Sequence, residues 1–227
     1  YIAETGNLAF IDEVIPFANK DKGTVYEHLK RAIDFSMNHL GTHGMPAGLH
    51  ADWNDCLRLG KDGESSFVAF QFYYAMSVML QFAEYKNDIT YINYLKAKQN
   101  ELAKDIEEFC WNEDRFIRGF TDKGEVIGCR TDKEANLWLN PQSWSVISGY
   151  ATKDQADKVL DIVYNRLNTE YGAILMDPPY HYDAFPGAFA VIYNAGCKEN
   201  AGIFSQSQGW IILAEALRGH GERAFNY

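Results

Sequence analysis

One segment of the chain, residues 65–84, constrains the fold more than any other. Its apolar side chains recur at the three- and four-residue spacing of an α-helix. The positions on one face are Val68, Phe72, Ala75, Met76, Met79 and Leu80. Phe70, Tyr73 and Tyr74 broaden that face until the helix is apolar nearly all round, and a helix of this kind is covered on several sides. The chain therefore has to supply further helices that pack against it.

Helical patterns recur along most of the remaining chain. Two segments open with a capping box, Thr24 with Glu27 and Thr152 with Gln155, and extend to about residues 41 and 167. Further helical patterns span residues 88–111, 138–150 and 206–218, and another begins at residue 221. The sequence thus predicts about six or seven helices, several of them with a defined start.

Two stretches between these helices have a different pattern. Residues 115–128 alternate around the turn at residues 122–124 and predict one short β-hairpin. Residues 171–198 are rich in Pro, Gly and aromatic residues without a clear period, so we expect a long structured loop, which in a compact domain is usually functional. Because strands and helices do not alternate, we predict an all-α domain of paired helices.

The composition narrows the class of protein. With 227 residues, 47% of them hydrophobic, the chain can form one domain with a sizeable core or part of a larger one. Its net charge of −10 and the absence of a basic run argue against a nucleic-acid partner. Four widely spaced cysteines predict buried thiols in a reducing compartment, so we expect a cytoplasmic protein. No apolar run approaches the roughly 18 residues of a membrane helix, and Tyr1 is not an initiator methionine.

Residues 48–60 form the candidate site, because they place polar and aromatic side chains on a loop between two predicted helices. A carboxyl group beside the indole of Trp53 would suit a general acid, since an apolar neighbour disfavours ionisation. An indole flanked by Asn54 and Asp55 also suits a sugar site, where the ring stacks on the pyranose. The competing interpretation is structural. In it, Asp52 and Asp55 are turn and helix-capping residues and Trp53 belongs to the core.

Two longer motifs favour a functional role for residues 48–60 over a purely structural one. Residues 50–60 read HADWNDCLRLG, residues 193–204 read YNAGCKENAGIF, and residues 208–215 and 219–225 read QGWIILAE and GHGERAF. The first motif resembles the catalytic-acid segment of the disaccharide phosphorylases of glycoside hydrolase family 94. The others resemble the Lys-Glu-Asn block of that family and the helix that follows it. The resemblance is specific from residue 48 to residue 227 and looser over the first 40 residues.

The resemblance implies a particular architecture. Members of the family have an (α/α)6-barrel catalytic domain, with the active site among loops at one end of the barrel. The predicted helices of residues 1–227 amount to about half of those in such a barrel, so we expect part of a single catalytic domain. The N-terminal β-sandwich domain and the C-terminal remainder of the family's proteins are absent from this sequence. The family's proteins are typically homodimers.

The resemblance also assigns roles to individual residues. It implies that Asp55 is the catalytic acid and that Trp53 and Asp52 line the sugar site, although an Asx contact that shapes the loop is an equal alternative for Asp52. Tyr193, Lys198 and Glu199 match further substrate-binding positions. Without the resemblance, Lys198 and Glu199 would be a surface pair and Tyr193 a core residue.

One position departs from the family pattern. Gln206 stands where the family has a phosphate-binding histidine, and it can donate a hydrogen bond to phosphate but carries no charge. The hydroxyl groups of Ser205 and Ser207 are further candidates for this contact.

The reaction expected from the resemblance is inverting phosphorolysis of cellobiose to α-glucose 1-phosphate and glucose, with inorganic phosphate as co-substrate. No metal or organic cofactor is expected, because His50, Asp52 and Asp55 match no established metal-site spacing. Three alternatives stay open: a phosphorylase for another β-glucoside such as laminaribiose or a cellodextrin, an inverting β-glucosidase with Glu199 as base, and an inactive sugar-binding fragment. An inverting hydrolase would need a second carboxylate roughly 6.5–9.5 Å from the acid.

Overall fold

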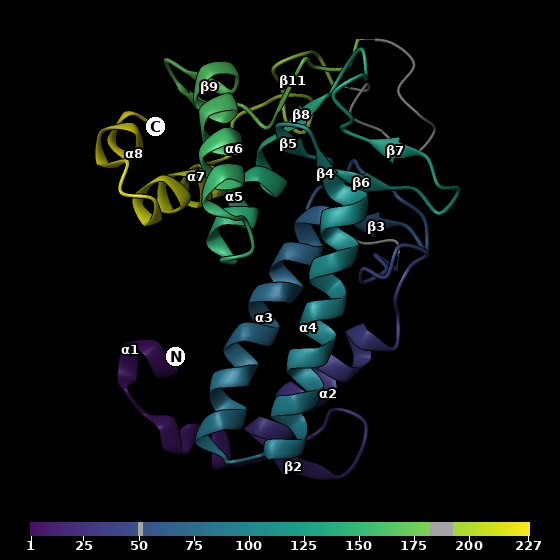
Figure 1. Ribbon diagram of the computed structural model, residues 1–227, viewed down its shortest axis with the longest axis vertical. Coiled ribbons are helices and arrows are strands. Elements are labelled where there is room, and N and C mark those ends of the chain that lie inside the picture. The colour runs from purple at the N-terminus through teal and green to yellow at the C-terminus, as the bar shows by residue number, and fades with distance from the viewer. Residues whose placement is uncertain (50–51, 182–192) are drawn as a thin grey trace.

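A computed structural model describes residues 1–49, 52–181 and 193–227. Its centre is an antiparallel pair of long helices, α3 (Ser66–Tyr85) and α4 (Ile89–Cys110), which run side by side along the long axis of the molecule in Figure 1. The Oγ atom of Ser65 caps α3 and the carboxylate of Asp88 caps α4 by accepting a hydrogen bond from Tyr91 N. Both starts agree with the sequence prediction.

The N-terminal segment packs around the lower end of this pair. It comprises α1 (Ile2–Thr5), the 3₁₀ helix η1 (Leu8–Asp12), the antiparallel strands β1 (Val14–Pro16) and β2 (Lys22–Thr24), and α2 (Val25–Met37). The predicted capping box at the start of α2 is confirmed, with Thr24 and Glu27 each bonding the backbone N–H of the other. Helix α2 contacts α3 and thereby covers part of its second side.

The C-terminal helices gather at the upper end, as Figure 1 shows. They are α5 (Leu139–Ile147), α6 (Lys153–Arg166), α7 (Ser205–Leu217) and α8 (Gly221–Asn226). Helix α5 contacts α3, α6 and α7, so it links the two groups of helices. The capping box predicted at Thr152 and Gln155 is also confirmed.

Short antiparallel strands connect these helices. The prediction of a single hairpin is wrong, because the described residues form several strand pairs. The predicted hairpin is present as β6 (Gly119–Phe120) and β7 (Val126–Ile127), with β3 (Glu64–Ser65) added to its other edge. Further pairs are β4 (Trp111–Asn112) with β5 (Arg115–Phe116), β8 (Leu137–Trp138) with β11 (Met176–Asp177), and β9 (Asn168–Thr169) with β10 (Gly172–Ala173). Each of these strands has two residues, which is too short to leave a period-two pattern in the sequence.

The remaining sequence predictions are confirmed in part. Helices dominate the described residues, but Figure 1 shows no closed ring of helices among them. Strands β10 and β11 lie inside the predicted loop of residues 171–198, and residues 182–192 of that loop lie outside the described residues. In the part of the chain that the structure describes, no helix combines the length and the apolar character needed to cross a membrane.

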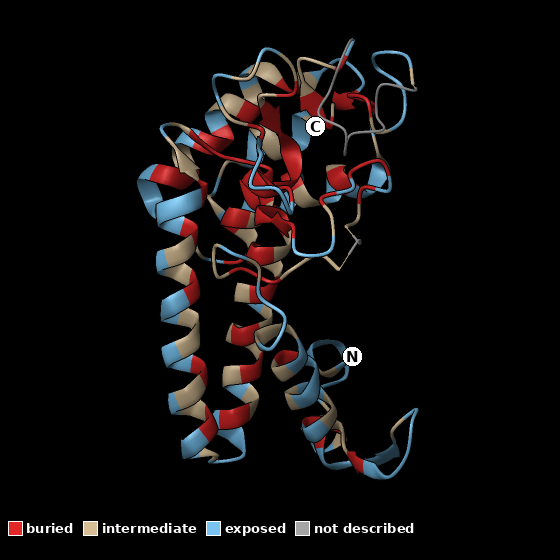
Figure 2. Cartoon of the chain, turned by 90° about the vertical axis from the view of Figure 1, so that its right-hand side faces the viewer, coloured by how far each residue is buried: buried red, intermediate tan, exposed pale blue. Residues whose placement is uncertain are grey.

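The hydrophobic core follows the helix pair, and Figure 2 shows buried residues concentrated where the upper helices and strands meet. Its largest cluster includes Phe70, Met76, Leu95 and Ile106, all within 1% of complete burial. A smaller cluster, which includes Cys56, Leu57, Leu59, Trp138 and Tyr180, lies beneath the candidate site. Helix α3 is less enclosed than predicted, because Tyr74 keeps 44% of its surface exposed.

This burial leads to a stability prediction for α4. Replacing Ile106, which is fully buried, with alanine removes apolar contacts and leaves a cavity, so we expect the free energy of unfolding to fall by about 2–5 kcal/mol. Replacing Ile89 at the start of the same helix, where 63% of the side chain is exposed, should change it by less than about 0.5 kcal/mol. Urea unfolding of both variants measures the difference, and equal losses would contradict the assigned core.

Candidate active site

A buried ion pair between Asp52 and Arg118 anchors the loop that follows residue 51. Arg118 Nη2 donates to Asp52 Oδ1 over 2.5 Å, and the two side chains are 0% and 1% exposed. Arg118 Nη1 donates to Ser65 Oγ over 2.7 Å, so the same guanidinium also contacts the residue that caps α3. The ion pair therefore attaches the candidate loop to the helical scaffold.

Asp52 also shapes the loop locally. Its Oδ1 atom accepts a hydrogen bond of 2.9 Å from Asn54 N, which is the Asx contact expected as one of the two roles of this residue. Burial by itself raises the pKa of Asp52, but the charge and hydrogen bonds of Arg118 outweigh it and hold the pKa below its ordinary value. Asp52 is therefore an anion directed into the protein, and its described contacts are structural.

Trp53 joins two parts of the chain that are far apart in sequence. Its Nε1–H donates to Gln206 Oε1 over 2.8 Å, and its ring makes edge contacts with Phe204 and Trp210 at centroid distances of 5.2 and 5.6 Å. Phe204 precedes α7, and Gln206 and Trp210 lie on it. The structure thus brings the first motif and the segment after the Lys-Glu-Asn block into direct contact.

Asp55 lies on the same loop with its side chain exposed. The indole of Trp53, two positions earlier in the loop, packs against Phe204 and Trp210. The backbone next to Asp55 is well held, because Asn54 Oδ1 accepts a hydrogen bond of 3.0 Å from Cys56 N and Asn54 is 3% exposed. The carboxyl group is available to a ligand from the solvent side.

The Lys-Glu-Asn block is a tight turn organised by Asn200. This side chain is fully buried, accepts from Tyr180 N, and donates to the carbonyl groups of Tyr180 and Tyr193. Lys198 is exposed, with Nζ 4.9 Å from the ring centroid of Tyr193. The turn presents the side chains on either side of Asn200 toward the candidate loop.

Glu199 and Tyr193 lie beside Cys56, the residue that follows Asp55. Burial raises the pKa of the Cys56 thiol, and the Glu199 carboxylate raises it further, while a hydrogen bond involving Tyr193 opposes the shift. Glu199 Oε2 is buried without a hydrogen-bond partner among the described residues. The predicted residues Asp55, Glu199 and Tyr193 therefore all lie near Cys56.

With this geometry established, comparison with known proteins identifies the family. The model of the catalytic domain of the glycosyl hydrolase 94 superfamily matches residues 1–227. The chain belongs to this superfamily. The resemblance seen in the two motifs is thereby confirmed.

Several curated relatives can be aligned with this chain over nearly its whole length. N,N′-diacetylchitobiose phosphorylase of Vibrio furnissii is 37% identical over 229 residues, which cover 100% of this chain and 28% of the relative. Solabiose phosphorylase of Paenibacillus borealis is 32% identical, covering 100% of this chain and 30% of the relative. Cellobionic acid phosphorylase of Neurospora crassa is 30% identical, covering 99% of this chain and 29% of the relative. The chain spans less than a third of the length of these relatives.

A solved structure resembles the fold. The GH78 family rhamnosidase of Bacillus sp. GL1 is similar with a TM-score of 0.56 and 15% sequence identity, over 72% of this chain and 16% of that chain. At this identity the likeness concerns the fold alone.

Sequence reasoning missed several residues that build this glycosyl hydrolase 94 site. Arg118 lies in the predicted hairpin, where a single arginine carries no signal of burial. Gln208, within the second motif, clamps β10 by bonding both Ala173 N and Ala173 O. Asn200 lies in the Lys-Glu-Asn block, and the motif by itself gives it no structural role. Their functions depend on contacts between distant segments, which one sequence does not reveal.

Two histidines outside the candidate site have structural partners. His43 Nδ1 contacts the buried Glu64 at 2.6 Å, and His220 Nδ1 contacts the buried Glu215 at 2.6 Å. His50 lies outside the described residues. Among residues 1–49, 52–181 and 193–227, no three His, Cys, Asp or Glu side chains lie together so as to hold a metal ion. The expectation of buried thiols is confirmed for Cys56 and Cys110 and wrong for Cys197, which is exposed.

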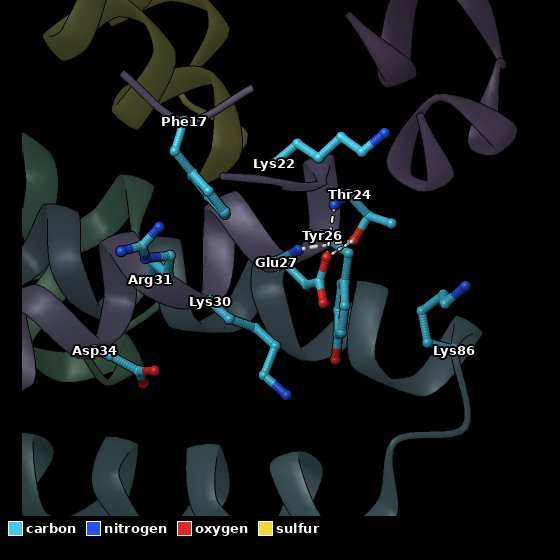
Figure 3. Close-up of a pocket in the computed structure, with 9 residues that line it drawn as sticks. All are labelled: Phe17, Lys22, Thr24, Tyr26, Glu27, Lys30, Arg31, Asp34 and Lys86. Atoms are coloured by element: carbon cyan, nitrogen blue, oxygen red, sulfur yellow. Dashed lines mark hydrogen bonds between the residues drawn. The ribbon is translucent and has the colours of Figure 1, made fainter. Parts of the chain in front are cut away.

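A pocket of about 660 Å³ lies at the other end of the molecule, around β2 and the start of α2 (Figure 3). Its cationic side chains largely serve the fold, because Lys30 pairs with Asp88 at 2.9 Å and Lys86 pairs with Asp12. Glu27, also in this pocket, is part of the capping box of α2. None of the predicted site residues lines it.

The Asp52–Arg118 pair leads to a pH prediction. The folded-state pKa of Asp52 lies below its unfolded value of about 3.9, so its contribution to stability is present above about pH 4 and is lost as the pH falls through the folded-state pKa. Asp52→Asn leaves Arg118 buried without its anion, and we expect a loss of about 3–5 kcal/mol at pH 7. Urea unfolding at pH 7 and pH 3 should show the difference from wild type shrinking at the lower pH. Asp62→Asn, at an exposed position nearby, is the control, and a pH-independent loss in Asp52→Asn would contradict this assignment.

Proposed function

We propose that this chain carries the catalytic acid of an inverting phosphorylase that acts on a β-linked disaccharide. The observation that supports this most is the hydrogen bond of 2.8 Å between Trp53 and Gln206, which joins the loop that carries Asp55 to the start of α7. In the proposed site, a general acid and an anion-binding group face a common space beside an aromatic ring. A phosphorylase needs these three elements.

Asp55 is the proposed general acid. It donates its proton to the glycosidic oxygen while a phosphate oxygen attacks the anomeric carbon from the opposite face. The glycosidic bond breaks, the leaving sugar keeps the proton, and the donor sugar becomes an α-glycosyl 1-phosphate with inverted configuration. Phosphate is already an anionic nucleophile, so this reaction needs no second carboxylate as base. The exposed position of Asp55 is compatible with direct access to the substrate.

The start of α7 is the proposed phosphate side of the site. The helix begins at Ser205 without a side-chain cap, and the N–H groups of an uncapped helix start attract anions. Because Gln206 Oε1 accepts the indole N–H, the amide nitrogen is the atom that can donate to phosphate. Gln206 can therefore replace the hydrogen bond of a histidine at this position, but not its charge.

The proposed substrate is N,N′-diacetylchitobiose or a closely related disaccharide. Support comes from two N,N′-diacetylchitobiose phosphorylases, which are 37% and 34% identical over the whole chain. Cellobiose, the substrate expected from the motif resemblance, is the second candidate. Trp53, Tyr193, Lys198 and Glu199 are the proposed sugar contacts. In every case inorganic phosphate is the co-substrate, and the reaction as proposed uses no metal or organic cofactor.

We also propose the setting in which the chain works. The family match and the partial span of the relatives support a chain that is part of an (α/α)6-barrel domain in a longer cytoplasmic protein. That protein would carry an N-terminal β-sandwich domain and further C-terminal sequence, and would form a homodimer. Size-exclusion chromatography and a structure of the full-length protein test these points.

An inverting hydrolase is the second candidate function. The observation that favours it is Glu199, which lies beside Cys56 and has a buried oxygen without a partner among the described residues. Product analysis of the full-length protein with and without phosphate separates the two reactions. Phosphate-dependent release of a sugar 1-phosphate supports the phosphorylase, whereas release of free sugar that is unaffected by phosphate supports the hydrolase. No turnover of any disaccharide would favour a sugar-binding role.

Replacing the proposed acid tests its role directly. Asp55→Asn in the full-length protein keeps the size of the side chain and removes the transferable proton, so we expect phosphorolysis to fall about 10²–10⁴-fold with an unchanged melting temperature. Asp62→Asn, in the same loop region, should keep wild-type turnover. Near-normal activity of Asp55→Asn would refute the assignment.

The position of Gln206 predicts an effect on phosphate. Gln206→Ala removes the bond to Trp53 together with the proposed hydrogen bond to phosphate, and loss of the latter, worth about 1 kcal/mol, should raise KM for phosphate roughly fivefold. Gln206→His restores a group that can carry charge, so KM for phosphate should fall below the wild-type value at pH 6. Initial rates at varied phosphate and fixed disaccharide measure both changes. An unchanged KM for phosphate in both variants would exclude Gln206 from the phosphate site.

A further inference from the structure

We propose that Arg118 is a positioning residue for Asp55, acting through a relay of hydrogen bonds that runs along the candidate loop. The inference rests on the function proposed above and adds a residue that neither motif contains. The relay starts at a guanidinium that is 0% exposed and ends at the peptide N–H that follows Asp55. It determines where the exposed carboxyl group of Asp55 points.

The first part of the relay is the attachment of Arg118 to the scaffold. Its backbone bonds both neighbouring segments of the three-stranded sheet, with Arg118 N donating to Ile127 O over 2.7 Å and Ser66 N donating to Arg118 O over 3.2 Å. Its guanidinium lies near the rings of Phe67 and Trp138, 5.8 and 5.5 Å from their centroids. A side chain restrained at both ends in this way provides a fixed point.

Gly128 shows how closely the structure packs around this arginine. It has φ of +80°, and a Cβ atom there would come within 2.8 Å of Arg118 N and 2.9 Å of Trp138 Cδ1. Only glycine tolerates both the backbone conformation and this approach. The turn after β7 therefore packs directly against the backbone of Arg118 and helps to fix the start of its side chain.

The second part of the relay runs through the loop itself. Arg118 holds Asp52 Oδ1, which accepts from Asn54 N over 2.9 Å, and Asn54 Oδ1 in turn accepts from Cys56 N over 3.0 Å. Leu57 N donates to Asn54 O over 3.0 Å and completes the turn. The last two bonds restrain the two peptides that flank Asp55, through Asn54 O and Cys56 N, so a displacement of Asp52 is passed to the catalytic position.

The chemistry of the pair explains why arginine is suited to this role. The planar fork of a guanidinium donates from two nitrogens in fixed relative directions, and here it reaches Asp52 and Ser65 at once. A lysine at the same position would present one rotatable ammonium group. The loop and the cap of α3 would then no longer be held in one orientation, although a positive charge would remain.

The experiment compares two buried arginines of the same segment in the full-length protein. Arg118→Lys disturbs the relay, whereas Arg115→Lys is a matched control, since Arg115 is 4% exposed and bonds Asp114 and Asn136 instead of the loop. Turnover is measured with the disaccharide and with the 2,4-dinitrophenyl glycoside of its donor sugar, both with phosphate. The dinitrophenolate leaves without protonation, so its release does not need a well-placed acid.

A misplaced acid predicts a specific pattern. Arg118→Lys should lower kcat on the disaccharide about 100-fold and on the aryl glycoside less than about tenfold, because an error near 1 Å in a catalytic group has a cost of this order. Arg115→Lys should leave both rates near wild type. Hydrogen exchange at the amides of Asn54 and Cys56 should be faster in Arg118→Lys than in Arg115→Lys, and Asp52→Asn should increase it in the same way.

Two outcomes would overturn the proposal. Equal losses on both substrates would mean that Arg118 contributes only to folding, and unchanged exchange at Asn54 and Cys56 in a folded Arg118→Lys variant would mean that the relay does not restrain the loop. A wild-type protein that shows no phosphate-dependent turnover would instead refute the proposed function. The exchange measurement needs no activity, so the two failures can be told apart.

Discussion

The buried ion pair between Arg118 and Asp52 is the contact on which the arrangement of the candidate site depends. Taking two charges out of water is costly, and their attraction recovers that cost only with good geometry and further hydrogen bonds. Here Ser65 and the backbone of Asn54 supply such bonds, so the pair is held in one arrangement. Ser65 caps α3 and Asp52 opens the candidate loop. One guanidinium therefore connects the start of α3 to the loop that carries the proposed catalytic residue.

A second contact sets the other side of the site. The indole of Trp53 binds Gln206 through its N–H and packs on Phe204 and Trp210 through its ring, so the loop and α7 are joined by both polar and apolar contacts. Trp210 also lies 5.4 and 5.8 Å from the ring centroids of Phe67 and Trp144. This aromatic cluster extends from α3 through α5 to α7, which explains how the helical framework can hold the two motifs in register.

The site residues differ in whether their side chains are buried and hydrogen-bonded within the fold or exposed to solvent. Asp52, Asn54 and Asn200 are buried and use their polar atoms to form the turns that carry the site. Asp55 and Lys198 are exposed on those turns, and Gln206 is exposed at the start of α7. This division is what a binding site requires: rigid supporting residues keep a small number of exposed groups in place. The described contacts of Asp52 are within the protein, and its role as a sugar ligand stays a prediction.

The sequence alone determined the helices and their starts, because capping residues and apolar spacing act over a few neighbouring positions: Thr24, Ser65, Asp88 and Thr152 all cap the predicted helices. Its two motifs also indicated the family. Only the tertiary structure decided that Arg118 reaches Asp52, that Gln206 meets Trp53, and that Asp55 is exposed while Asp52 is buried. Two aspartates three positions apart are alike in sequence, and what separates them is the segment that packs against each. Such contacts join residues 66 and 153 positions apart, a separation at which local propensity carries no information.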